Sequence, residues 1–181
     1  MSRLIKLDKR EDILPKYRDT PIGLLIEYHN FNREYKEYTS AQLLVGMCMD
    51  NRKHLHIPEN FTYIIRSGGA NLRNSEFRVS YAIAVGGIRH IALIAHNNCG
   101  MVNLKARKEL FIEGLIERAG WDREMAEDHF NQNEPSHEIG HEIDFIISES
   151  CRLRQRYPKI VVAPMYYSVD DNRLFLVNED E

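Results

Sequence analysis

Cys48, His96 and Cys99 carry thiol and imidazole side chains, which are the groups that bind zinc most often in proteins. Two residues separate His96 from Cys99, so both side chains can turn toward one point from a single loop. A catalytic zinc has three protein ligands and keeps a fourth position open. Each residue alone is more often a buried structural side chain, but together they predict a catalytic zinc site.

Asp50 and Arg52 follow Cys48 at alternate positions. If this segment is extended, the two side chains share an orientation, and a carboxylate and a guanidinium stand beside the metal. An Asp-x-Arg pair by itself is usually a solvated surface ion pair. Its closeness to Cys48 favours a role in the site.

A second zinc pattern, H-E-x-x-H, runs from His137 to His141 with Glu138 as its acid. On one helix, such histidines can bind zinc and the glutamate can act as a general base, as in metalloproteases. The extended H-x-x-G-x-x-H form is absent, and Pro135 and Ser136 indicate a helix start that would put His137 in the first turn. We therefore expect a solvated helix face here, with a cleft-lining histidine or a proton shuttle as the second interpretation.

Short apolar runs alternate with amphipathic segments along the chain, which predicts an α/β domain with a mainly parallel sheet. Residues 1–19 are polar and predict an arm with little structure, and 120–136 is a polar segment. We divide the chain into an N-terminal arm and helix (1–39) and a single zinc-binding α/β domain (40–181). The predicted strands are 42–48, 61–66, 90–95, 159–165 and 173–177, and the predicted helices are 21–35, 75–86, 101–119 and 138–157.

In open α/β sheets, ligands bind at the carboxyl ends of the strands. Cys48 ends the first predicted strand, the segment 66–71 follows the second, and His96 and Cys99 follow the third. Three strand ends therefore deliver two thiols, an imidazole and a glycine-rich loop to one crevice.

The composition limits the classes of protein to which the chain can belong. Its 181 residues, 43% of them hydrophobic, can bury one sizeable core. The net charge of -3 gives no support to a nucleic-acid partner, and no apolar run is long enough to span a membrane. The charged N-terminus does not resemble a secretory signal, and three cysteines argue against a disulfide framework. We expect a cytoplasmic protein.

The pattern C-x-D-x-R from Cys48, followed by H-x-x-C-G from His96, resembles the β-class carbonic anhydrases. The similarity covers about residues 40–105 well, including the segment 65–71, and the remainder weakly. The resemblance implies a four-stranded parallel sheet extended by a fifth edge strand and flanked by helices. It also implies a homodimer or higher homo-oligomer, with the cleft at the subunit interface.

Carried over by position, the resemblance implies that Cys48, His96 and Cys99 bind Zn²⁺ and that Asp50 and Arg52 form the catalytic dyad. Gly100 would give a backbone N–H to the substrate. The implied reaction is the reversible hydration of carbon dioxide to bicarbonate by zinc-bound hydroxide. Asp50 would accept the hydroxide proton, while Arg52 would keep the Asp50 carboxylate off the metal.

Departures from the family pattern leave other functions open. Ala95 stands where the family usually has glycine, and Met101 where a smaller residue is common. These changes leave room for a hydrolase of carbon disulfide or carbonyl sulfide. A non-catalytic zinc-binding assembly module and a thiol-redox protein using Cys48 and Cys99 are the further alternatives.

His54 and His56 are candidate proton shuttles because they lie close to the dyad in sequence. Cys151 lies in the last long helix, where we expect it to be core or semi-buried. Trp121 and Asp122 indicate a helix start within the polar segment.

Overall fold

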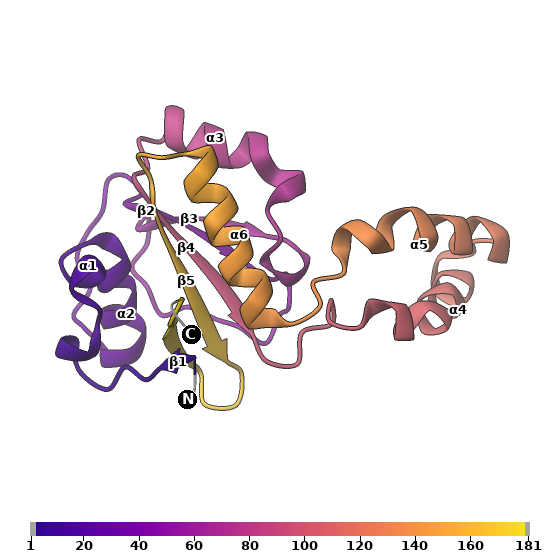
Figure 1. Cartoon of the computed structure of the whole chain (residues 1–181), viewed down its shortest axis with the longest axis horizontal. Coiled ribbons are helices and arrows are strands. Elements are labelled where there is room, and N and C mark those ends of the chain that lie inside the picture. Colours follow the sequence, from indigo (N-terminus) through magenta and orange to yellow (C-terminus); the bar gives the residue numbers. More distant parts are fainter. Residues whose placement is uncertain (1–2, 180–181) are drawn as a thin grey trace.

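The computed structural model describes residues 3–179, which contain one six-stranded sheet of order β1-β6-β5-β4-β2-β3 (Figure 1). The pairs β2–β3, β2–β4 and β4–β5 are parallel, whereas β6 is antiparallel to both of its neighbours. The strands are β1 (Leu4–Ile5), β2 (Leu43–Met47), β3 (Thr62–Arg66), β4 (His90–His96), β5 (Val161–Ser168) and β6 (Arg173–Val177). The α/β fold class is therefore confirmed.

Six α-helices are present in the described part of the chain. They are α1 (Pro15–Arg18), α2 (Pro21–Phe31), α3 (Glu76–Ala84), α4 (Lys108–Ala119), α5 (Arg123–His137) and α6 (Glu142–Arg156). Helices α1 and α2 cover one face of the sheet, and α3 and α6 cover the other (Figure 1). Because both faces are covered, every residue of β2 is buried, as its continuous apolar run predicts.

Residues 3–19 contain a strand and short helices, which corrects the prediction of an arm with little structure. Leu4 and Ile5 form β1 and pair with β6, while Leu7, Ile13 and Tyr17 are buried in the core beneath α2. The added strand makes β1 the edge, so β6, the predicted edge strand, lies inside the sheet.

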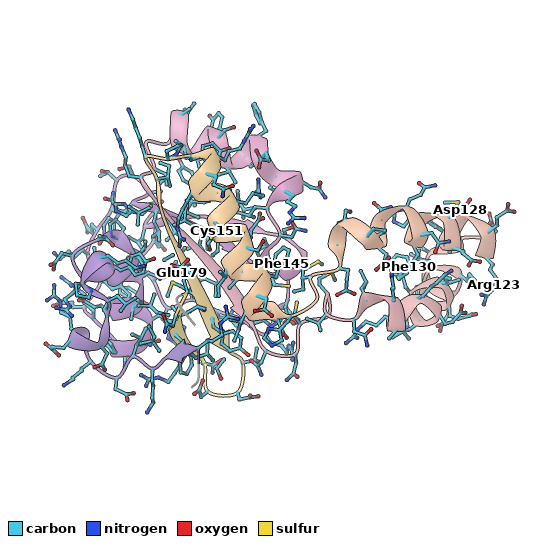
Figure 2. The ribbon with its side chains drawn as sticks, viewed as in Figure 1. Arg123, Asp128, Phe130, Phe145, Cys151 and Glu179 are labelled. Carbon is cyan, nitrogen blue, oxygen red and sulfur yellow. The ribbon has the colours of Figure 1, made fainter. Side chains whose placement is uncertain are left out.

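The polar segment after residue 120 is also helical, forming α5. Asp122 caps this helix as predicted, since its side chain accepts a hydrogen bond from the N–H of Met125 (2.8 Å). Helices α4 and α5 form a hairpin that projects away from the sheet (Figure 1). Phe130, which is labelled in Figure 2, lies on α5 in this hairpin. It packs against Phe111 of α4, with ring centroids 5.3 Å apart.

Several helix boundaries follow their local signals. Thr20 caps α2 by accepting from the N–H of Ile22 (3.2 Å), and Asn32 ends that helix in the left-handed region, earlier than predicted. Helix α6 begins at Glu142 instead of 138. Cys151 of α6 is exposed, which corrects the prediction that it is core or semi-buried (Figure 2). None of the described helices is long and apolar enough to cross a membrane.

Candidate metal centre

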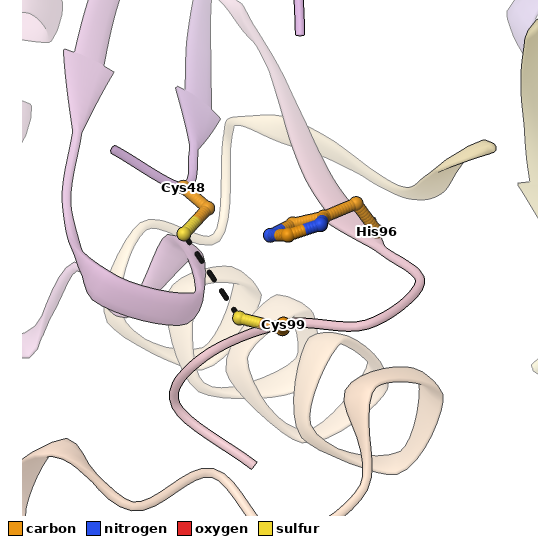
Figure 3. A group of neighbouring side chains, drawn as sticks. All are labelled: Cys48, His96 and Cys99. Carbon is orange, nitrogen blue, oxygen red and sulfur yellow. Dashed lines mark hydrogen bonds between the residues drawn. The ribbon is translucent and has the colours of Figure 1, made fainter. Parts of the chain in front are cut away.

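Strands β2 and β4 place the three predicted metal-binding side chains next to one another. Cys48 directly follows β2, His96 is the last residue of β4, and the two strands pair in parallel. Cys99 returns from the turn after β4, so that the three ligand atoms all lie within 4.8 Å of one another (Figure 3). All three residues are buried. The structure thus brings together the cluster predicted from the strand ends.

The hydrogen bonds of His96 leave one ring nitrogen free. Its Nδ1 lies 2.9 Å from the carbonyl oxygen of Asn97, so Nδ1 must carry the proton and donate. Its Nε2 is buried and has no hydrogen-bond partner among the described residues. A buried nitrogen lone pair without a partner is costly, unless a ligand such as a metal ion accepts it.

The two thiols lie within hydrogen-bonding distance, with Cys48 Sγ 3.9 Å from Cys99 Sγ. The pKa of the Cys48 thiol is lowered because its thiolate accepts from Cys99, and also from the N–H of Gly69 at 3.3 Å. The same contact with Cys48, together with burial, raises the pKa of Cys99. Two sulfurs and a free imidazole nitrogen are a donor set that suits Zn²⁺.

Asp50 and Arg52 form a bidentate ion pair beside this cluster. Arg52 donates from Nε to Oδ1 of Asp50 (3.0 Å) and from Nη2 to Oδ2 (2.6 Å). These bonds hold the pKa of Asp50 well below its usual range. Arg52 Nη2 also donates to the carbonyl oxygen of Asn98 (3.1 Å), which ties the pair to the turn that carries Cys99.

Arg66, at the end of β3, holds the loop that carries the pair. Its Nη1 donates to the carbonyl oxygens of Cys48 (3.1 Å) and Asp50 (3.3 Å), and its Nη2 donates to that of Lys53 (3.2 Å). The predicted strand 61–66 ends at Arg66 and so placed it at the correct edge of the sheet, but the sequence did not predict these contacts. They depend on the β2–β3 pairing.

The H-E-x-x-H residues lie on different elements, which does not match a protease site. His137 is in the last turn of α5, so Pro135 and Ser136 do not start a helix, and His141 is the residue before α6. Between them Gly140 has a φ of 66°, a value that favours glycine. The His141 side chain is 62% exposed.

Glu138 and Ile139, from the same stretch, join the α4–α5 hairpin to the metal-binding loops. The Glu138 carboxylate accepts from the N–H groups of Asn103 (3.0 Å), Leu104 and Gly140 (2.8 Å). Ile139 packs with Cys48 and Cys99 in a small apolar cluster. The stretch is thus a connector between the hairpin and the site.

Gly69 and Gly100 shape the backbone around the cluster. Gly69 has a φ of 61°, and a Cβ there would lie 2.7 Å from Cγ2 of Ile139, so glycine permits both the turn and the contact. A Cβ on Gly100 would meet nothing within 4 Å. The backbone of Gly100 is therefore not crowded on that side.

The candidate proton shuttles lie outside this cluster of contacts. His54 is exposed. The N–H of His56 donates to Nδ1 of His29 (3.1 Å), and the two rings are 5.2 Å apart. His29, a buried residue of α2, had no identifiable signal in the sequence because its partners lie far along the chain.

Comparison of the sequence with models of known protein families gives no match, and neither does comparison with curated proteins. Solved structures do match. The β-carbonic anhydrase isoform I of Trichomonas vaginalis is 17% identical with a TM-score of 0.65, over 82% of this chain and 91% of that one. The carbonic anhydrase of Streptococcus mutans is 18% identical with a TM-score of 0.60, over 92% of this chain and 100% of that one.

A carbon disulfide hydrolase in its apo form also has this fold. It is 20% identical with a TM-score of 0.55, over 77% of this chain and 80% of that chain. Identities this low show a shared fold, and the choice of reaction has to come from the residues of the site.

Proposed function

We propose that this chain, which has the fold of the β-class carbonic anhydrases, is a zinc enzyme that catalyses the reversible hydration of carbon dioxide to bicarbonate. The observation that carries the proposal is the Asp50–Arg52 pair, held in bidentate geometry beside Cys48, His96 and Cys99. A structural zinc site has no need of such a pair, whereas a hydration site needs an acceptor that orients its nucleophile.

The thiolates of Cys48 and Cys99 and Nε2 of His96 would hold the zinc ion. Zinc in such a site acts as a Lewis acid that brings the deprotonation of water within reach of neutral pH. A zinc ion with two thiolate ligands would be a formally neutral centre, so it would activate water less than a zinc ion with three imidazole ligands. Residues around the metal must therefore contribute more to orienting the nucleophile.

Asp50 supplies that orientation. Its carboxylate is ionised because Arg52 donates to both of its oxygens. It therefore can only accept a hydrogen bond, which aims a lone pair of the nucleophile at the carbon of carbon dioxide. Arg52 holds both carboxylate oxygens and is itself bound to the Asn98 carbonyl, which keeps Asp50 from turning onto the metal.

The variant Arg52→Ala tests this assignment. We expect the protein to keep its zinc, while carbon dioxide hydration in a stopped-flow assay falls by about 10- to 100-fold. The matched control is Arg107→Ala, which removes an exposed arginine outside the cluster and should not change the rate. If Arg52→Ala retains both zinc and full activity, the role of the pair is wrong.

Hydrolysis of carbon disulfide or carbonyl sulfide is the second candidate, because a solved carbon disulfide hydrolase shares the fold. In this chain the side chain of Met101 packs closely against the loop after β3, since a Cβ added to Gly68 would lie only 2.9 Å from Met101 Sδ. Rates on carbon dioxide and on both sulfur compounds, measured with one zinc-replete preparation, distinguish the two reactions. A zinc-loaded protein inactive on all of them would indicate an assembly module.

A second copy of this chain is the partner that we propose. Strand β3 is an edge of the sheet, with Tyr63 and Ile64 exposed. Beside it, Phe77 of α3 (80%) and Val85 at the C-cap of α3 (67%) are also exposed. Exposed apolar side chains on an unpaired sheet edge mark an association surface.

All three cysteines are free of disulfide bonds, which supports the proposal of a reducing, cytoplasmic location.

A further inference from the structure

Lys53 is a buried lysine whose ammonium group has no partner among the described residues. Its side chain has no exposed surface, and its Nζ makes no hydrogen bond to any described residue. No ion pair joins Lys53 to a carboxylate within residues 3–179. A charged group in this situation is strongly unfavourable unless an opposite charge is supplied. Either Lys53 has a purely structural role, or its counter-charge arrives with a ligand.

The loop that carries Lys53 lies against the turn that carries Cys99, because Arg52 Nη2 donates to the carbonyl oxygen of Asn98 (3.1 Å). The Arg66 guanidinium binds the carbonyl oxygens of Cys48, Asp50 and Lys53 together, so the loop curls around one side chain. Burial lowers the pKa of Lys53, whereas the charges of Cys48, Asp50 and Cys99 act in the opposite direction. The ammonium group therefore lies in the electrostatic field of the candidate site.

Among the charged groups around the site, Lys53 is fully buried and has no partner among the described residues. Two thiolates offset a divalent metal ion, and Asp50 is neutralised by Arg52. Arg66 is exposed, so water screens its charge, and its guanidinium is occupied by backbone carbonyls. The Glu142 carboxylate, which accepts from the N–H of Cys99 (3.5 Å), is only partly buried and is therefore also screened by water, so Lys53 is left as the fully buried charge. A site of this kind attracts a small anion.

We infer that Lys53 is an anion-binding residue of the site and that its buried ammonium favours bicarbonate over the neutral molecule carbon dioxide. The inference rests on the proposed function for the identity of the anion. In the direction of hydration, carbon dioxide and water give bicarbonate and a proton, so a negative charge appears on the bound molecule as the C–O bond forms. The Lys53 charge then acts on the product and not on the substrate.

The test is anion binding to the cobalt(II)-substituted protein, followed by its visible absorption spectrum. Bicarbonate and thiocyanate are titrated against the parent, Lys53→Met and Lys53→Gln. We expect both variants to bind cobalt like the parent, and to bind each anion at least about tenfold more weakly. The matched control is Lys105→Met, which removes an exposed lysine that follows Gly100 in sequence and should leave the Kd unchanged.

Parent-like anion affinity in Lys53→Met and Lys53→Gln would overturn the inference. So would failure of both variants to fold or to take up cobalt, because Lys53 would then be a structural residue. The titration needs no turnover, which separates the two proposals. A protein that binds anions through Lys53 but hydrates no carbon dioxide would refute the proposed reaction and leave the anion site standing.

Discussion

Acid should destabilise this protein through His29, because the ring is held in its neutral form. Its Nδ1 accepts a hydrogen bond from the N–H of His56 (3.1 Å), so Nε2 must donate to the carbonyl of Asn172 (2.9 Å). A proton on Nδ1 would face the His56 N–H and break that bond. Burial lowers the pKa of His29 to about 4, from 6.5.

The sign of the effect follows from where the proton binds. Between pH 6.5 and pH 4 the unfolded chain protonates this histidine and the folded chain does not. The free energy of unfolding therefore falls as the pH is lowered through this window. A shift of one pKa unit corresponds to about 1.4 kcal/mol, so the full effect is about 3 kcal/mol, of which about 2 kcal/mol is reached at pH 4.5.

Urea denaturation of the parent and of His29→Gln, at pH 7 and at pH 4.5, measures this contribution. The variant loses buried hydrogen bonds and is less stable at pH 7, but the gap between the two proteins should narrow by about 2 kcal/mol at pH 4.5. His54→Gln, which replaces an exposed histidine, is the control. A gap of constant size at both pH values would refute the neutral, buried His29.

Two further predictions concern the connector and the sheet edge. Glu138→Ala removes an acceptor shared by three backbone N–H groups and should lower stability by about 2 kcal/mol, with faster hydrogen exchange around residues 103–104. Unchanged exchange there would contradict the connector role. Phe77→Asp places a charge on the exposed face of α3 and should convert a dimer to monomers in sedimentation velocity. Identical sedimentation of parent and variant would exclude this face as the interface.

The sheet and the grouping of Cys48, His96 and Cys99 were predictable because their signals are local. The β2 and β4 segments are continuous apolar runs, and Cys48 and His96 stand at their carboxyl ends, where parallel pairing must bring them together. Parallel pairing of β2 with β4 was therefore sufficient to predict that Cys48 and His96 lie close together. The Asp50–Arg52 contact was predictable for the same reason, since both residues lie in one short loop.

The errors arise where distant partners or sparse apolar patterns decide the structure. Leu4 forms a strand because it pairs with Val177, at the other end of the chain. Helix α5 buries only Ala126, Phe130 and Glu134, too few apolar residues for a clear period. Glu138 belongs to a known motif, but two of its three backbone partners, Asn103 and Leu104, precede it by more than thirty positions.

The contact between Cys48 and Cys99 has a consequence for folding. The two sulfurs are 51 positions apart in sequence and meet only when β2 and β4 are paired. A metal ion bound to both would act as a crosslink that closes this long loop, and it would bind the folded chain in preference to the unfolded one. Removing the ion with a chelator should therefore loosen the centre of the sheet first, while the outer β5–β6–β1 pairing persists.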